Sequence, residues 1–250
     1  MNRRVRLAVC SCAALVFFLY LLIFQVIGTL PNISALDNVL AGEASVTVCN
    51  LKGESLFEYA PPAYGEMTPI SLDAVCDELI AATVAAEDRT FFTNPGYSPT
   101  AILRAFIQNL IMRRTYSGAS TITQQVVKNI LISPDERYSR SVGRKMKEII
   151  LSAAVSRRYS KEDILTLYLN QIYYGSGAVG AEKAAENYFE TSASSLSEYQ
   201  AAYIAGLPQA PNYYAGNPDE AEKRAAEVLR LLRRDGCVQV SSEGRMYCSE

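Results

Sequence analysis

Three polar side chains at regular spacing suggest a ligand site on one helix. Ser120, Gln124 and Lys128 recur every four residues, so a helix would project a hydroxyl, a carboxamide and an ammonium group from one face. These groups could bind a sugar phosphate. Taken alone, the spacing fits a solvated helix face better, because the apolar residues between them would enter the core. The rest of the chain has to decide between the two interpretations.

Two carboxylates could take part in acid–base chemistry. Glu87 ends an alanine-rich segment, and burial against an apolar wall would raise its pKa toward that of a general base. An ion pair with Arg89 is the alternative. Glu148 follows Arg144 and Lys145 at helical spacing, and such helix ion pairs contribute only about 0.2 to 0.5 kcal/mol. Neither carboxylate identifies a reaction by itself.

The composition excludes several kinds of site. The chain of 250 residues contains no histidine, which rules out imidazole metal ligands and nucleophiles activated by histidine. It has no Ser-x-x-Lys sequence for a serine acyl-enzyme and no Cys-x-x-Cys pair among its six cysteines. The net charge is −2, yet residues 128–161 carry nine basic and three acidic side chains. This local excess predicts an anionic ligand rather than nucleic acid, although a solvated basic helix fits the same charges.

The N-terminus predicts a membrane anchor. Residues 7–30 are 24 positions without a formal charge, long enough as a helix to cross a hydrocarbon core of about 30 Å. Arg3, Arg4 and Arg6 place residues 1–6 in the cytoplasm and the rest of the chain outside it. A cleaved signal peptide is the alternative, but the apolar stretch is longer than a signal core. The expected location is the cell membrane, with one span and an extracytoplasmic domain.

The remainder divides into three regions. Residues 31–70 are predicted to form a linker with a short β-hairpin, 71–236 one mostly helical domain, and 237–250 a C-terminal hairpin or the start of a further region. Ser160 with Asp163, and Ser195 with Glu198, have the spacing of capping boxes. The predicted helices span 72–92, 99–114, 120–131, 142–158, 161–169, 178–188, 196–206 and 218–234.

Six short motifs follow one another along the predicted domain. They are Glu87-Asp-Arg-Thr-Phe91 with Gly96, Gly118-Ala-Ser-Thr-Ile-Thr-Gln-Gln125, Arg144-Lys-Met-Lys-Glu148, Tyr159-Ser-Lys161 with Ile164-Leu165 and Tyr168-Leu-Asn170, Tyr174-Gly-Ser-Gly-Ala178 with Gly180, and Ala205-Gly-Leu-Pro-Gln-Ala-Pro211. Together and in this order they resemble the glycosyltransferase family 51 domain, the peptidoglycan glycosyltransferase of class A penicillin-binding proteins and monofunctional transglycosylases. The resemblance covers residues 45–236.

The resemblance implies a mostly α, lysozyme-like fold, with a globular lobe and a smaller membrane-facing lobe, preceded by one transmembrane helix and a short β-hairpin. It implies an enzyme that polymerises a lipid-linked disaccharide-peptide precursor, lipid II, into glycan strands, with inversion and release of polyprenyl diphosphate. The expected partners are lipid II, the growing strand, the membrane and other cell-wall synthesis proteins.

The resemblance also implies roles for individual residues. Glu87 would be the base that deprotonates the acceptor 4-hydroxyl. Glu148 would assist departure of the diphosphate, or hold a divalent cation such as Mg or Mn beside it, and no other cofactor and no dedicated metal site are expected. The implied substrate-binding residues are Asp88, Arg89, Ser120, Thr121, Gln124, Gln125, Lys128, Arg137, Arg144, Lys145 and Lys147.

Several positions depart from the family pattern. Asn94 stands where the family often has histidine, and Ser98 where it has aspartate. Ser156 and Thr166 replace two family glutamates. Two alternatives therefore stay open, a lysozyme-like glycan hydrolase that uses the same carboxylates, and a non-catalytic membrane scaffold of the cell-wall machinery. The basic side chains favour a diphosphate leaving group, which a hydrolase would not require.

Two further segments each have two interpretations. Residues 101–112 are apolar on more than one face and precede Arg113 and Arg114, which fits either a core helix or one that dips into the membrane near a lipid substrate. Cys237 and Cys248 would face each other across a hairpin and could form a disulfide outside the cytoplasm. Two reduced thiols on a frayed tail are the alternative.

Overall fold

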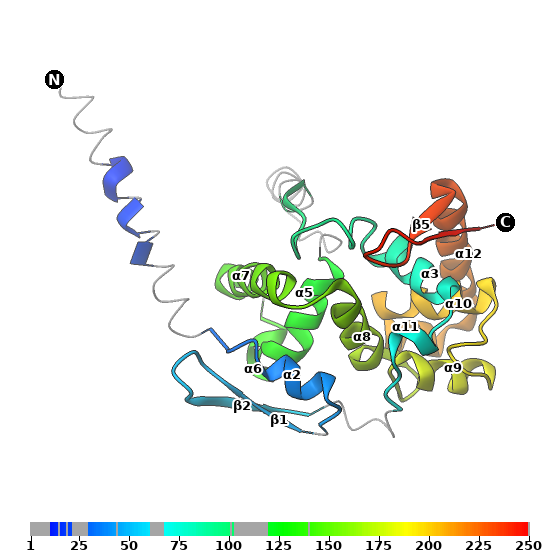
Figure 1. The fold of residues 1–250 in the computed structure, drawn as a ribbon, viewed down its shortest axis with the longest axis horizontal. Helices are drawn as coiled ribbons and strands as arrows, with labels where there is room; N and C mark the ends of the chain where they lie inside the picture. Colours follow the sequence, from blue (N-terminus) through cyan, green and yellow to red (C-terminus); the bar gives the residue numbers. More distant parts are fainter. Residues whose placement is uncertain are drawn as a thin grey trace, which may run out of the picture.

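A computed structural model describes residues 11–21 apart from 15 and 19, 30–60 apart from 44, 68–100, 102, 120–139 and 141–249. The described chain is mostly helical, as the sequence predicts (Figure 1). No helix in these ranges is both long and apolar enough to span a bilayer. Most of the predicted anchor at 7–30, and nearly all of the apolar segment 101–112, lie outside the described residues.

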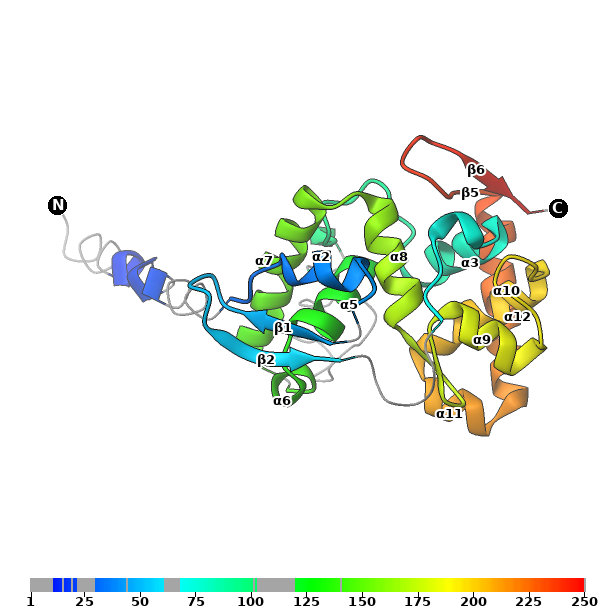
Figure 2. The same cartoon turned by 60° about the horizontal axis from the view of Figure 1, so that its bottom comes forward.

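A two-stranded sheet and a short helix precede the helical part. β1 (Val46–Cys49) and β2 (Ser55–Tyr59) run antiparallel. Val46 and Val48 are buried on one face of the sheet, as expected when alternate side chains of a strand point to the covered side. α2 (Ala35–Leu40) packs on β1 and also contacts α8 (Lys161–Gln171), the central helix of the domain (Figure 2).

One helix from the start of the domain, α3 (Asp77–Glu87), packs closely with two from its end, α10 (Glu198–Gly206) and α12 (Pro218–Asp235). α3 and α10 are alanine-rich where they are buried, because small side chains allow two helix backbones to approach. The shorter elements around them are η1 (Leu72–Ala74), α9 (Ala181–Phe189), η3 (Leu207–Gln209) and α11 (Pro211–Gly216).

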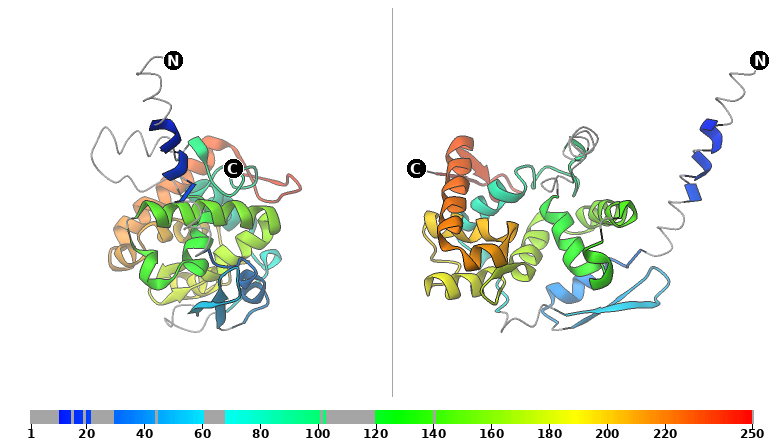
Figure 3. Two further views of the ribbon diagram at one scale, coloured as in Figure 1. Left: turned by 90° about the vertical axis from the view of Figure 1, so that its left-hand side faces the viewer. Right: turned by 180° about the vertical axis from the view of Figure 1, so that it is seen from behind.

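A second group of helices carries the polar motifs of the middle of the chain: α5 (Ile122–Val126), the π-helical turn η2 (Val127–Leu131), α6 (Pro134–Arg137) and α7 (Val142–Arg158). α8 (Lys161–Gln171) lies between this group and the α3, α10 and α12 group (Figures 2 and 3). β3 (Tyr173–Gly175) and β4 (Ala178–Val179) follow α8 as a second small antiparallel pair.

Some predicted boundaries were wrong for identifiable reasons. The predicted helix 120–131 divides, because the chain changes from α-helical to π-helical hydrogen bonding after Val126. The helix predicted from residue 178 starts only after Gly180, whose φ of +89° ends the short strand β4. The capping box of α10 is formed by Ser197 and Gln200, not by the predicted pair two residues earlier, whereas Ser160 caps α8 as predicted.

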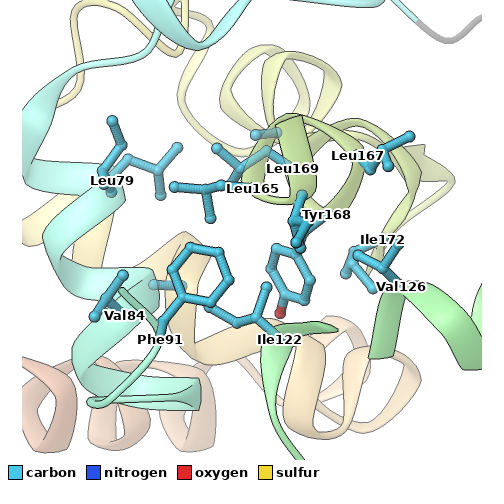
Figure 4. Packing of buried hydrophobic residues seen from close by; sticks show 14 of the residues in the cluster. Leu79, Val84, Phe91, Ile122, Val126, Leu165, Leu167, Tyr168, Leu169 and Ile172 are labelled. Atoms are coloured by element: carbon cyan, nitrogen blue, oxygen red, sulfur yellow. The ribbon is translucent and has the colours of Figure 1, made fainter. Parts of the chain in front are cut away.

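The core joins the two helix groups through α8. Leu79 and Val84 of α3, Ile122 of α5 and Leu165 and Tyr168 of α8 lie in one buried cluster (Figure 4). Each of these side chains is no more than 1% exposed. Truncating one such Leu or Ile to Ala typically costs about 2 to 5 kcal/mol, so this cluster fixes α3 relative to α5.

A hairpin closes the described chain. β5 (Cys237–Gln239) and β6 (Met246–Cys248) pair antiparallel, and a disulfide joins the two cysteines. The turn of the hairpin lies on the start of α8, where Ser242 N donates to Glu162 Oε1 at 2.6 Å. Arg245 forms an ion pair of 3.0 Å with Asp77 at the start of α3. The disulfide is the first of the two interpretations of these cysteines, and the hairpin bridges α3 and α8.

Candidate active site

Glu87 is the last residue of α3, and the chain leaves the helix at the extended residue Asp88. Glu87 Oε2 accepts a hydrogen bond of 2.5 Å from Gln125 Nε2. Burial raises the pKa of Glu87, the Gln125 hydrogen bond and the charge of Arg224 oppose this, and the charge of Asp88 adds to it. A carboxylate with a raised pKa, oriented by one amide donor, has the properties of a general base.

The start of α5 places Gln125 beside Glu87. Gln124 N donates to Thr121 Oγ1, and Thr121 N donates to Gln124 Oε1, each at 3.1 Å, which completes a capping box. Thr121 Oγ1 also donates to Gly96 O at 2.7 Å. This bond ties the first turn of α5 to the loop that follows α3, so the loop and the helix together set the position of Gln125.

Asp88 and Arg89 form their hydrogen bonds with the protein around this loop and do not line the cavity. Asp88 is only 7% exposed and accepts hydrogen bonds from Asn94 Nδ2 at 2.9 and 3.0 Å, from Thr90 Oγ1 at 3.2 Å and from Ile122 N at 3.3 Å. Arg89 is exposed, and its Nε donates to a backbone carbonyl of α3 at 3.5 Å. The predicted substrate-binding role of both residues stays untested, but both carboxylate oxygens of Asp88 already accept hydrogen bonds from groups of the protein.

A cavity of about 670 Å³ opens beside Glu87. Its wall contains the amide groups of Gln124 and Gln125, and the buried Gln124 Nε2 has no hydrogen-bond partner within the described part of the chain. A donor therefore remains for a ligand oxygen. The predicted site residues that line the cavity are Glu87, Ser120, Gln124, Gln125, Lys128 and Arg137. Those that do not are Asp88, Arg89, Thr121, Arg144, Lys145, Lys147 and Glu148.

Two cations give the cavity wall a positive side. Lys128 comes from η2, and its Nζ lies 5.5 Å from the centre of the Tyr138 ring. Burial lowers the pKa of Lys128, and the charges of Arg144 and Arg137 lower it further. Arg137 Nη2 donates to Asn129 O at 2.6 Å, which anchors its guanidinium group at the end of the same turn. Cations that repel one another are stabilised when an anionic ligand binds between them.

Glu148 lies behind this wall rather than in it. It is 2% exposed, and one carboxylate oxygen contacts Arg144 Nη1 while the other contacts Lys145 Nζ at 2.9 Å. Lys145 Nζ also donates to Ser120 Oγ at 3.1 Å, so this partly buried pair contacts the cavity wall through one hydroxyl. Burial, with the charges of Arg144 and Lys128, lowers the pKa of Lys145 to about 8. Lys147 instead pairs with Glu136 at 2.9 Å.

The surroundings of Glu148 do not fit a divalent cation. Both of its oxygens are occupied by cationic side chains, whereas Mg²⁺ needs carboxylate oxygens that are free to coordinate. In the ranges that the structure covers, no cluster of three acidic, cysteine or histidine side chains could hold a metal ion.

Sequence reasoning missed several residues of the cavity. Tyr59 and Gln171 meet in its wall, where Tyr59 OH donates to Gln171 Oε1 at 2.6 Å. Arg224 enters from α12 and passes over Gly206, where a Cβ atom would lie 2.8 Å from Arg224 Cγ. Gly206 lies in one of the six motifs identified in the sequence. The signal that could have indicated Arg224 is its position as a basic residue within a helix of repeated charges. The further lining residues are Ala86, Asn129, Tyr138, Ile172, Tyr173, Pro208, Gln209, Pro211 and Asn212.

Glu87, the two amides and the two cations line one cavity, and comparison with known proteins identifies the family of the chain. The sequence model of the transglycosylase family matches residues 53–233. The chain therefore belongs to the transglycosylase family, in agreement with the resemblance drawn from its motifs.

Curated relatives are penicillin-binding proteins. The chain is 39% identical over 200 residues to penicillin-binding protein 1A/1B of Bacillus subtilis (strain 168), an alignment that covers 79% of the chain and 21% of the relative. It is 41% identical over 171 residues to penicillin-binding protein 1A of Aquifex aeolicus (strain VF5), covering 68% and 23%. It is 34% identical over 213 residues to penicillin-binding protein 1A of Escherichia coli (strain K12), covering 84% and 24%. The chain thus spans less than a quarter of the length of these relatives.

Proposed function

We propose that this transglycosylase domain is a peptidoglycan glycosyltransferase that polymerises lipid II into glycan strands. The observation that carries the proposal is the shared cavity of Glu87, Lys128 and Arg137, because it unites a candidate base with two cations. A transfer that expels a diphosphate needs both. Its membership of the transglycosylase family supports the same reaction.

In the proposed reaction Glu87 removes the proton of the acceptor 4-hydroxyl. The hydroxyl oxygen forms a bond to the anomeric carbon of the donor as the bond from that carbon to the diphosphate oxygen breaks, with inversion. The leaving polyprenyl diphosphate keeps the electron pair, and Lys128 and Arg137 stabilise its charge. Glu87 then releases its proton to solvent. Gln125 orients the carboxylate throughout, since it donates to Oε2.

Glu148 has a supporting role in this proposal. Its buried carboxylate holds Arg144 and Lys145 in place, and Lys145 in turn contacts Ser120 in the cavity wall. Only Glu148 is fully buried in these pairs, so removing both cations would leave its charge uncompensated and strongly destabilise the protein. Glu148 therefore acts on the donor side by holding the side chains of Arg144 and Lys145 in position.

We propose further that the domain works outside the cytoplasm, anchored by residues 7–30, with N-terminal residues 1–6 inside. Two observations support this location. The disulfide between Cys237 and Cys248 is typical of an oxidising compartment. The uncharged length of residues 7–30 follows a basic N-terminus. The proposed partners are lipid II, the growing strand, the membrane lipid and other cell-wall synthesis proteins.

One assay separates this function from its alternatives. The protein is incubated with labelled lipid II and, separately, with finished glycan strands. Polymer formed from lipid II supports the transferase. Cleavage of finished strands without polymer would identify a hydrolase, and neither reaction would identify a non-catalytic scaffold.

A further inference from the structure

A lysine outside the cavity contacts the loop that follows Glu87. Lys161 is the first residue of α8, and its Nζ donates to Asn94 O at 2.8 Å and to Ser156 Oγ at 3.2 Å. The same Nζ lies 4.7 Å from the centre of the Phe91 ring. Within the described residues no carboxylate forms an ion pair with it. A partly buried ammonium group without an ionic partner requires a reason, because burial disfavours its charged form.

Asn94 links Lys161 to Asp88. Its Nδ2 donates to both oxygens of Asp88, at 3.0 and 2.9 Å, and its Oδ1 accepts from Gly96 N at 2.9 Å. Asp88 Oδ2 then accepts from Ile122 N, in the first turn of α5. The chain of contacts therefore runs from α8 through the loop to α5. Asp88 is next to Glu87 in sequence. Ile122 lies three residues before Gln125, the residue that donates to Glu87.

We propose that Lys161 is a positioning residue for Glu87, acting through Asn94 and Asp88. The inference rests on the proposed function of Glu87. A buried carboxylate is stable in its ionised form only when hydrogen bonds and nearby positive charge replace water. Asn94 supplies the hydrogen bonds and Lys161 the charge. Ionised Asp88 in turn holds the start of α5, and so the contact between Gln125 and Glu87.

The charges along this series of contacts affect the pKa of Glu87, which can be measured. Burial raises the pKa of Asp88, and its hydrogen bonds and the charge of Lys161 oppose the rise. The negative charge of Asp88 raises the pKa of Glu87. The other groups that act on the pKa of Glu87 are Gln125 of α5 and Arg224 of α12. The charge of Glu87 in turn raises the pKa of two buried phenols, Tyr168 of α8 and Tyr174 of β3. The Gln125 hydrogen bond lowers the pKa of Glu87 by more than the charge of Asp88 raises it, so a variant that loses the contact between Gln125 and Glu87 should have a higher pKa at Glu87.

The test measures polymerisation of lipid II against pH for the parent, Lys161→Met, Lys161→Arg, Asp88→Asn and the double variant. A base is active when deprotonated, so activity falls as pH falls through the pKa of Glu87. We expect Lys161→Met and Asp88→Asn each to shift this acid limb to higher pH, because the Gln125 hydrogen bond that lowers the pKa of Glu87 is lost. They should also lower kcat by roughly 10- to 100-fold with little change in KM, as a displacement of about 1 Å can do. Lys161→Arg should restore part of the rate. The double variant should be no worse than the poorer single one, because both act on one chain.

The controls separate this role from simple loss of stability. Lys183→Met breaks an exposed ion pair with Glu186 on α9 and should leave the pH profile unchanged. An unmoved acid limb in Lys161→Met, or additive losses in the double variant, would overturn the proposal. If Asp88→Asn does not fold, the comparison of Lys161→Met with Lys161→Arg decides by the same limb. A parent that makes no polymer would refute the proposed function instead, and crystal structures of the parent and Lys161→Met would still show whether Gln125 leaves Glu87.

Discussion

At the scale of single residues, the proposed base Glu87 is assigned a proton transfer that no histidine can take over, because the chain contains none. Replacing it with glutamine keeps its size and a hydrogen bond to Gln125 but removes its basicity. We expect Glu87→Gln to bind lipid II and to polymerise it about 10² to 10⁴ times more slowly. Glu186→Gln on α9 is the matched control and should polymerise like the parent. Near-parental polymerisation by Glu87→Gln would mean that the base is another group.

Lys128 should behave differently from Glu87, because its charge acts on the diphosphate both before and during bond cleavage. We expect Lys128→Ala to weaken lipid II binding and to lower kcat/KM by at least about tenfold, the scale of one charge-assisted hydrogen bond of roughly 1.5 to 3 kcal/mol. The weakening should be largest at low ionic strength, since salt screens the parent interaction. Binding measured at two salt concentrations checks this. An unchanged affinity for lipid II would remove Lys128 from the donor site.

The sequence predicted the residue types of the site better than their positions. Glu87 and Lys128 were identified because a base and a cation occurred in recognisable motifs, and both line the cavity. The direction in which Asp88 points could not be predicted, because it depends on Asn94 and Ile122, which come from two separate segments. Arg224 was missed for the same reason, since only the packing of α12 against α10 brings it to the cavity.

At the scale of elements, the loop after α3 depends on one glycine. Gly96 has a φ of +93°, and a Cβ atom there would lie 2.2 Å from Ser152 O in the backbone of α7. Gly53, in the turn between β1 and β2, has a similar φ of +84° but open space around it. A comparison of substitutions at Gly53 and Gly96 therefore separates the cost of a positive φ from the cost of steric overlap.

We expect Gly53→Ala to cost about 1 kcal/mol, the usual penalty for a left-handed conformation, and Gly96→Ala to cost more than about 3 kcal/mol. Gly96→Ala should also lose polymerisation even where it remains folded, because the loop that carries Asp88 and contacts Thr121 must move. Denaturant unfolding of both variants gives the comparison. Equal losses of stability would show that α7 does not restrict the loop.

At the scale of the whole molecule, the C-terminal hairpin ties together the starts of α3 and α8. The disulfide closes it with a sequence separation of 11, and Val238 and Val240 of the hairpin are buried. We expect the variant with Cys237→Ser and Cys248→Ser to lose about 2 to 4 kcal/mol of stability. Peptide mapping of the parent without reductant should recover the two cysteines in one linked fragment. Free alkylation of both thiols in the native protein would contradict the bridge.

The apolar segment 101–112 raises the last question at this scale, because the lipid tail of the proposed substrate stays in the bilayer and the cavity must remain within its reach. A chain that begins at Ala44 lacks the predicted anchor, yet we expect it to bind anionic liposomes through this segment and the adjacent Arg113 and Arg114. Replacing Phe106 and Leu110 with glutamate should abolish that binding, since charge opposes burial in the acyl region. The measurement is co-sedimentation with liposomes at low and high salt. If the shortened chain stays in solution with no liposome association, the segment belongs to the protein core and substrate capture depends on the anchor alone.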